Sequence, residues 1–188
     1  MDRSLLIPSF ALVAALFSQH AAAATPEFQL TPRVGYGSMR IDAISAINED
    51  ATSKDTIGLG VTGGYVTSFG LVAEIGADYF GHISILNVND SFELSEKFIS
   101  FGYQAEFGNG WRVVPKVGRA RWTLDSKEGW VFNPGPEERQ KVKGYDYFWE
   151  VSAGRRISNA VALSLAYRQG DFDFGRTRST VFGVTIAF

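Results

Sequence analysis

The sequence predicts an all-β protein: an eight-stranded antiparallel up-and-down transmembrane β-barrel. Large apolar residues alternate with small or polar residues over eight segments, which is the period-two pattern of strands. The connections between these segments alternate between long and short, as they do in barrels with long loops on one side of a membrane. The second face of the segments carries charges of both signs among Gly, Ala, Ser and Thr, which fit the narrow interior of an eight-stranded barrel.

The composition excludes several classes of function. The 188 residues include no Cys, so a disulfide framework and thiol chemistry are both excluded. A formal net charge of −2 argues against a nucleic-acid partner, because the neutralisation of phosphates requires clustered Lys and Arg. The sequence has neither a His and Cys pattern for a metal nor a phosphate-binding glycine loop, so we expect no metal and no cofactor.

The N-terminal segment predicts a cleaved export signal. Arg3 supplies a positive charge, residues 5–17 form an apolar run, and residues 21–24 offer an Ala-rich cleavage site. The run of about 13 residues is too short to span the ~30 Å of hydrocarbon in a bilayer. We therefore expect residues 1–24 to be removed and residues 25–188 to form one barrel domain.

The first four predicted strands are separated by two long connections and one tight turn. Pro32 lies inside the first strand, and we expect the N-terminal half of that strand to be bulged, because proline cannot donate to a strand ladder. The apolar parity of the fourth strand slips near Ser100, which predicts a second bulge. The strands are residues 28–42, 56–67, 71–80 and 96–107, and the connections between them are residues 43–55, 68–70 and 81–94.

The last four predicted strands follow the same plan. Asn109 and Gly110 mark a hairpin, because Asn-Gly accepts positive φ. The longest connection contains Pro134 and Pro136 and a charge run over residues 137–143, and we expect no regular strand there. The strands are residues 111–125, 145–157, 161–169 and 177–188, and the connections are residues 108–110, 126–144, 158–160 and 170–176.

The polarity of the two faces favours a membrane barrel over a soluble lipocalin-like barrel, which would bury its large apolar face inside. Here the small and charged residues, which share one face of the strands, fit the interior. The large apolar residues on the other face are expected to contact lipid. The aromatic residues fall into two levels, as expected for the girdles of a transmembrane barrel. Phe28, Tyr65, Phe107, Trp111 and Phe188 lie near the short-turn end, and Tyr36, Tyr79, Phe98, Tyr145, Tyr147, Trp149 and Tyr167 lie toward the long-loop end.

The last strand resembles the closing strand of bacterial outer-membrane barrels, in which the barrel assembly machinery recognises a terminal Phe preceded by apolar residues at every second position. The hairpin over residues 58–80, which ends in Ala-Asp-Tyr-Phe, resembles the OmpA and OmpX type of small barrel. The resemblance implies a monomer in the bacterial outer membrane, with periplasmic termini and with membrane lipid and lipopolysaccharide around it. The residues of the predicted assembly signal are Phe182, Val184, Ile186 and Phe188.

Strand parity predicts two groups of charged residues. Inward charges are expected to form an ion-pair network in the lumen, because an unpaired buried charge is costly. Outward arginines at the long-loop ends are expected either to bind lipopolysaccharide phosphates bidentately or to reach into water. The predicted network is Arg33, Glu74, Asp78, Glu106, Lys116, Glu150, Arg156 and Arg168, and the predicted lipopolysaccharide contacts are Arg40, Arg119, Arg121 and Arg178.

The expected function is a structural or surface-interaction role, in adhesion or envelope integrity, through the extracellular loops. The resemblance implies host or surface ligands for such barrels without naming one. A small pore is one alternative, against which the filled lumen of an eight-stranded barrel argues. A lipid A-modifying hydrolase is another, because His82 and Ser84, with Glu93 and Glu96 downstream, resemble the Ser and His of outer-membrane lipid A deacylases. The flanking sequence lacks that family's pattern, so we expect no enzyme.

Overall fold

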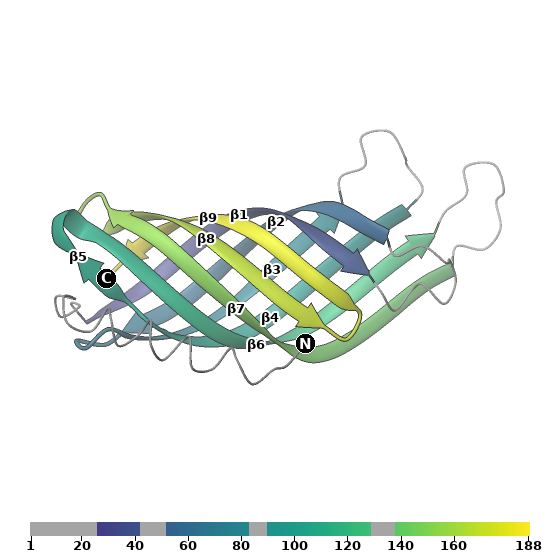
Figure 1. The fold of residues 1–188 in the computed structure, drawn as a ribbon, viewed down its shortest axis with the longest axis horizontal. Coiled ribbons are helices and arrows are strands. Elements are labelled where there is room, and N and C mark those ends of the chain that lie inside the picture. The colour runs from purple at the N-terminus through teal and green to yellow at the C-terminus, as the bar shows by residue number, and fades with distance from the viewer. Residues whose placement is uncertain (1–25, 42–51, 83–89, 129–137) are drawn as a thin grey trace, which may run out of the picture.

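The computed structural model describes residues 26–41, 52–82, 90–128 and 138–188, which form a barrel of antiparallel strands (Figure 1). The predicted export signal lies outside these residues. No helix among the described residues is both long and apolar enough to cross a membrane. The strands are β1 (Glu27–Ile41), β2 (Thr52–Val66), β3 (Leu71–His82), β4 (Asp90–Tyr103), β5 (Ala105–Phe107), β6 (Trp111–Glu128), β7 (Glu138–Arg156), β8 (Val161–Phe172) and β9 (Gly175–Ala187), with one 3-10 turn, η3 (Gly108–Gly110), between β5 and β6.

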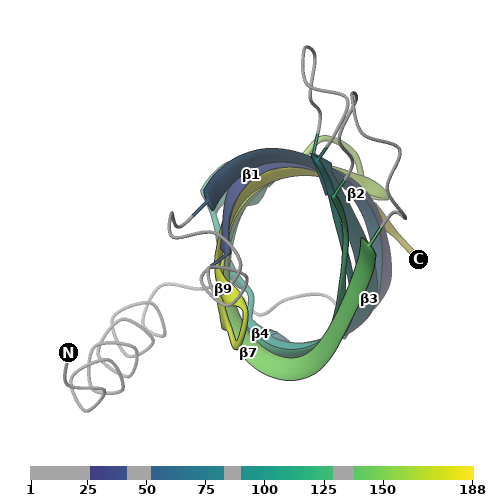
Figure 2. The same ribbon diagram turned by 90° about the vertical axis from the view of Figure 1, so that its right-hand side faces the viewer.

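The sheet closes on itself. Neighbouring strands pair in the order β4, β3, β2, β1, β9, β8, β7 and β6, and β6 pairs in turn with β4. At the short-turn end the backbones of Phe28 and Phe188 exchange two hydrogen bonds of 2.9 and 3.3 Å. The view along the barrel in Figure 2 shows the closed ring. Because β4 and β5 together make up the strand predicted over residues 96–107, the predicted eight-stranded antiparallel barrel is confirmed.

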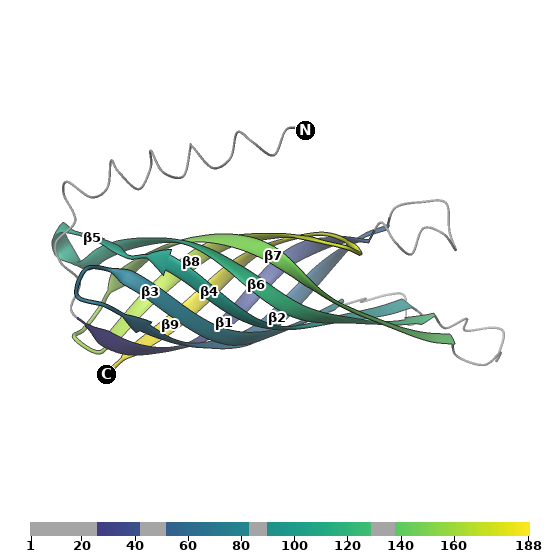
Figure 3. The ribbon, with the colours of Figure 1, turned by 90° about the horizontal axis from the view of Figure 1, so that it is seen from below.

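The stagger of the barrel follows from its pairing register. A path that starts at Gln29 on β1 and steps from each residue to its partner on the next strand returns to β1 at Met39, ten residues further along. In a barrel such a shear requires strands tilted by about 35–45° from the axis, and Figure 3 shows the strands running obliquely. The tilt brings side chains from strands that are far apart in the sheet to one level of the lumen.

The bulge predicted in the first strand is wrong. The register of β1 with β2 is unbroken from Glu27 to Ile41, and Pro32 lies opposite Val61. On the β9 side the pairing pauses at Thr31 and Pro32 and resumes in the same register. Proline lacks the N–H that would pair there, so the ladder loses a bond without gaining a residue.

The bulge predicted near Ser100 is also wrong. β4 and β5 keep one register against β6 from Asp90 to Phe107, and only Gln104 separates the two strands. The apolar parity slips for a different reason, because Phe98 points into the lumen and is only 5% exposed. Phe98 therefore does not belong to the outer aromatic girdle, where the sequence placed it.

Several strands run further toward the long-loop end than predicted. β7 begins at Glu138, inside the charge run over residues 137–143 where no strand was expected. This part of β7 pairs with the end of β6, and the Lys141 ammonium lies 4.0 Å from the Asp125 carboxylate. A strand that continues beyond the membrane needs no apolar face, so a charge run is compatible with pairing there. The connection expected over residues 170–176 is shorter for the same reason, since β8 and β9 leave only two residues between them.

Large apolar side chains cover the outer surface of the barrel. Leu59 and Ile75, in the interiors of β2 and β3, are 66% and 67% exposed, and Phe101 near the end of β4 is 60% exposed. A contiguous apolar exterior of this kind suits lipid and would be unstable in water. The face polarity predicted from the alternation is therefore present in the structure.

The lumen holds more than the small and charged residues that the sequence predicted. A buried apolar cluster fills its long-loop half, and it includes Phe174, which folds inward from the turn between β8 and β9. We call this set the apolar plug. Its members are Met39, Phe80, Leu94, Phe98, Ala120, Trp122, Leu124, Phe148, Phe172 and Phe174.

Glycines on neighbouring strands make room for four rings of the plug. Each ring lies over the glycine that is paired with it, where a β-carbon would come within 2.3 or 2.4 Å of the ring. The missing side chain of the glycine therefore gives a flat ring room in a narrow lumen. The ring in turn fills the space that the glycine leaves. The pairs are Gly58 with Phe80, Gly76 with Phe98, Gly118 with Phe148, and Gly144 with Trp122.

A methyl group at one of these glycines is expected to destabilise the barrel. In Gly118→Ala the new β-carbon would lie 2.4 Å from the Phe148 ring and 2.6 Å from the backbone oxygen of Ile99. We expect the free energy of unfolding in detergent to fall by about 1–3 kcal/mol, as for other overpacked sites. The matched control is Gly63→Ala on β2, where nothing lies within 4 Å of the new β-carbon. Equal urea midpoints for the two variants would contradict the proposed packing.

Candidate functional site

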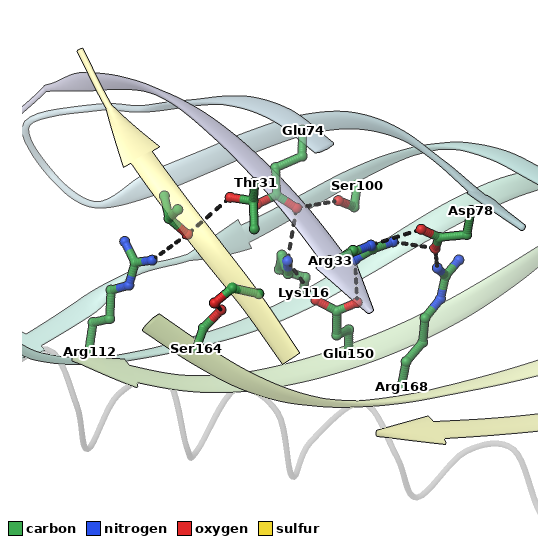
Figure 4. Close-up of polar contacts among 12 residues, drawn as sticks. Thr31, Arg33, Glu74, Asp78, Ser100, Arg112, Lys116, Glu150, Ser164 and Arg168 are labelled. Carbon is green, nitrogen blue, oxygen red and sulfur yellow. Dashed lines mark hydrogen bonds and ion pairs between the residues drawn. The ribbon is translucent and has the colours of Figure 1, made fainter. Parts of the chain in front are cut away.

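The centre of the lumen contains two carboxylates and two arginines. Asp78 on β3 and Glu96 on β4 are paired across the strands, and both are buried. Arg168, from β8 on the opposite wall, bridges them, with a bond of 2.7 Å to Glu96 and one of 2.5 Å to Asp78, the second of which Figure 4 shows. Arg33 on β1 binds Asp78 through two nitrogens, of which Nε lies 2.8 Å from Oδ1. The arginines thus offset two like charges that would repel each other at adjacent positions.

A second set of ion pairs extends this group toward the short-turn end. The Lys116 ammonium lies 2.7 Å from Glu150 and 2.8 Å from Glu74. Glu150 also accepts a bond of 3.2 Å from Arg33, and Glu74 accepts one of 3.2 Å from Ser100. One connected network therefore joins six strands across the lumen. We call its seven charged members, Arg33, Glu74, Asp78, Glu96, Lys116, Glu150 and Arg168, the central network.

A separate cluster lies at the short-turn end of the lumen. Arg156 on β7 contacts Glu27 at 3.1 Å and Glu106 at 3.5 Å. Arg112 lies nearby and donates a bond of 2.8 Å to the Thr185 hydroxyl. All the buried side-chain nitrogens and oxygens of the described residues have a hydrogen-bond partner, as the interior of a stable protein requires.

The structure places all eight charged residues predicted for the lumen on the inner face, but it divides them between two groups. Glu106 and Arg156 pair at the short-turn end, apart from the other six. The sequence prediction omitted Glu96, Glu27 and Arg112. Glu96 lies ten residues before Glu106, so unbroken alternation along the fourth strand would have predicted that both point inward. The bulge assumed near Ser100 reversed the predicted direction of Glu96.

Packed side chains close the lumen where the central network meets the apolar plug. The guanidinium of Arg168 stacks 3.7 Å from the centre of the Phe148 ring and 4.7 Å from that of Phe98, which joins the central network to the apolar plug. On the other side of the network the enclosed space is a polar cavity of about 40 Å³, between Glu74, Arg112 and their neighbours. That volume suits only a few water molecules. The described residues contain no group of side chains that could hold a metal ion.

The residues of the hydrolase alternative are not brought together in the described part of the chain. Ser84 lies outside the described residues, as does the side chain of His82. Glu96 points into the lumen and binds Arg168, so it is separated from the outer surface by the barrel wall. Its role in the structure is an ion pair.

The four predicted lipopolysaccharide contacts all point outward, on two separate parts of the barrel. Arg119 and Arg121 lie on β6. Arg40 and Arg178 lie on β1 and β9, which are paired with each other on the other side of the ring. The four arginines therefore form two surfaces.

The apolar residues of the last strand also face outward. Phe182, Ile186 and Phe188 are 43%, 36% and 75% exposed, and Val184 shares their side of β9. This stripe would contact lipid next to the seam between β1 and β9. It remains the predicted signal for the assembly machinery.

Comparisons with known proteins agree with the fold. The sequence matches the outer membrane protein beta-barrel domain family over residues 9–188. No curated protein sequence matches the chain. Similar solved structures include the Neisserial surface protein A, with a TM-score of 0.63 and 11% identity over 88% of this chain and 100% of that one. Ail of Yersinia pestis has a TM-score of 0.58 and 9% identity over 86% and 99% of the two chains. OprG of Pseudomonas aeruginosa has a TM-score of 0.53 and 9% identity, over 90% of this chain and 97% of that one.

Proposed function

The chain belongs to the family of outer membrane protein β-barrel domains, and we propose that it presents its long-loop end at the bacterial surface as a structural or adhesive element. In this orientation the termini are periplasmic and the loops are extracellular. The barrel serves as a membrane anchor. Its activity lies in contacts that the loop end makes with other surfaces and envelope components.

The closed lumen is the observation that carries this proposal. Solute transport needs a continuous aqueous path, and the apolar plug and the central network both lie across that path. Catalysis needs a pocket that gathers reactive side chains, and the charged side chains in the lumen are engaged with one another. The exterior along the strands is apolar and suits lipid. The loop end is then the surface that is left for a function in the aqueous phase.

The strands themselves contribute to that surface. β4, β6 and β7 continue past the end of the β8–β9 hairpin and form an extension that Figure 1 shows at the long-loop side. The pairing of β6 with β7 runs to Glu128 and Glu138, whereas the pairing of β7 with β8 starts only at Phe148. A paired extension carries the ends of these strands beyond the β8–β9 hairpin, where a partner can reach them.

The test uses cells and purified barrels together. A strain that lacks the protein and a complemented strain are compared for attachment to matrix-coated surfaces and for sensitivity to detergent. The complemented strain should attach better or resist detergent better than the strain that lacks the protein. A variant in which a short Gly-Ser linker replaces residues 129–137 should still fold but should not restore attachment or resistance. Barrels in planar bilayers should give no stable conductance steps. Reproducible steps, or a deletion strain equal to its parent in both assays, would contradict the proposal.

A further inference from the structure

The outer wall of the barrel is hollowed over β2, β3, β4 and β6. Two adjoining hollows, of about 650 and 720 Å³, share the residues Val61, Ala77, Lys97 and Arg121. Small outward residues, Ala77 and Gly63, form the low part of this surface. Larger apolar side chains surround them, so the hollow is an apolar groove in the lipid-facing wall. Those larger side chains are Leu30, Leu59, Ile75, Tyr79 and Ile99.

A cluster of cations lies on one side of the groove. Lys97 on β4 and Arg121 on β6 are paired directly across the strands, and Arg119 is two residues from Arg121 on the same face. No ion pair with a carboxylate of the described residues joins any of the three. The geometry concentrates positive charge at one place beside a mostly apolar groove.

Aromatic rings hold the two arginines in place. The Arg119 guanidinium lies 5.4 Å from the centre of the Tyr145 ring and 5.7 Å from that of Tyr147. The Arg121 guanidinium lies 5.8 Å from the Tyr145 ring. Stacking of this kind orients a guanidinium and leaves its N–H groups free to bind an anion bidentately.

The height of the cluster matches the boundary between hydrocarbon and headgroups. Arg121 is ten residues along β6 from Trp111, a girdle residue at the short-turn end. A strand rises about 3.3 Å per residue, and a tilt of about 35–45° leaves about 2.5 Å along the barrel axis. Ten residues then correspond to about 25 Å, the height of the apolar band of such barrels. The cations therefore lie near the outer headgroups, while the groove beside Ala77 lies within hydrocarbon.

We propose that this surface is a lipid-binding site, in which Lys97, Arg119 and Arg121 bind a phosphate of lipopolysaccharide and the groove over Ala77 holds one of its acyl chains. The inference rests on the proposed orientation, with the long-loop end outside. It also divides the four outward arginines by function. Arg119 and Arg121 bind lipid, and Arg40 and Arg178 do not.

The charge of the cluster selects the lipid. Three cations that pair with no carboxylate in the described part of the chain are best balanced by a phosphomonoester, which carries a charge of about −1.5 to −2. A phospholipid of the phosphodiester class carries a single negative charge on its phosphate. Lipopolysaccharide carries phosphomonoesters on its lipid A sugars and several acyl chains beside them. It therefore satisfies both parts of the site.

Native mass spectrometry of the refolded barrel in detergent tests the site, with lipid A, phosphate-free lipid A and phosphatidylglycerol as probes. The wild type should bind one lipid A molecule more tightly than either other lipid. Arg119→Gln with Arg121→Gln should weaken lipid A binding about tenfold or more, since charge-assisted bonds are lost. Ala77→Trp, which fills the groove, should weaken it as well. The matched control, Arg40→Gln with Arg178→Gln, removes the same charge and should bind within about twofold of wild type.

The outcomes separate the lipid site from the wider proposal. Each variant must first show the gel shift between unboiled and boiled samples that marks a folded barrel. If the Gln pair fails to fold, Arg119→Lys with Arg121→Lys keeps the charge, loses the stacked bidentate geometry and should still weaken binding. Unchanged binding in the folded variant, or equal binding of phosphatidylglycerol, would overturn the site. Failure of the lipid site would leave attachment measured on cells unaffected. The attachment assay therefore tests the proposed surface role independently.

Discussion

Arg168→Ala is expected to lower the free energy of unfolding of the barrel by about 3–5 kcal/mol, the effect of leaving buried charges without their partner. Arg168 is the cation that bridges Asp78 and Glu96, which face each other from adjacent strands. Without it, Glu96 loses its ion pair, and Asp78 keeps only Arg33. The guanidinium also leaves a gap against the Phe148 ring. Urea titration of tryptophan fluorescence, with the protein in detergent micelles, measures the change.

Two controls identify the cause of this loss. Arg155→Ala removes an exposed arginine from the outer face of β7 and should change the free energy of unfolding by about 0.5 kcal/mol or less. Arg168→Ala combined with Glu96→Ala should be less destabilising than the sum of the two single changes, because the partners are removed together. Strict additivity, or an effect of Arg168→Ala as small as that of Arg155→Ala, would show that the ion pairs are not coupled.

The second large effect is expected at Trp122, the largest side chain of the apolar plug. It is 1% exposed, and its ring lies 4.7 Å from that of Phe174 and 6.2 Å from that of Phe172. Its indole N–H donates a bond of 2.8 Å to Asp146. Trp122→Ala should therefore lower the free energy of unfolding by about 3–5 kcal/mol, as for other large aromatic truncations in cores. Urea unfolding and the loss of near-ultraviolet circular dichroism both report it.

Trp111 supplies the matched control, because it is 50% exposed at the short-turn end of the outer face. Trp111→Ala should have a clearly smaller effect than Trp122→Ala. Trp122→Phe keeps an aromatic ring over Gly144 but loses the bond to Asp146, and it should fall between the alanine variant and the wild type. If Trp111→Ala were the more destabilising change, the plug would not be part of the core.

Much of the fold follows from alternation alone, because lipid on one side and a packed lumen on the other impose different residues on the two faces. The resemblance to small outer-membrane barrels is confirmed by the family match. The alternation fails beyond the membrane, where both faces of a strand meet water. That is why the start of β7 at Glu138 was missed. An apolar pattern therefore predicts the membrane-spanning part of a strand and not its end.

The site was predicted only in part, because its geometry depends on register. Parity placed Asp78 and Arg168 inside, but their strands are on opposite walls, and only the shear brings the two side chains to one level. The inward position of Phe98 also depends on the register of the sheet. An aromatic residue can occupy a narrow lumen when a glycine is paired with it, and the pairing with Gly76 is a property of the sheet. A sequence that is read strand by strand does not contain this information.

The central network has a consequence for the order in which the barrel folds. Three of its ion pairs join β1 with β7, β3 with β8 and β4 with β8, and each of these pairs of strands has at least two other strands between them in the sheet. A partly assembled sheet therefore cannot form them, and a cation that it exposed at the bilayer midplane would cost about 2–4 kcal/mol. The growing sheet must keep this face hydrated until the edges of β1 and β9 meet. We therefore expect the pairing of these charges and the expulsion of lumenal water to occur in the same late step, when the seam closes.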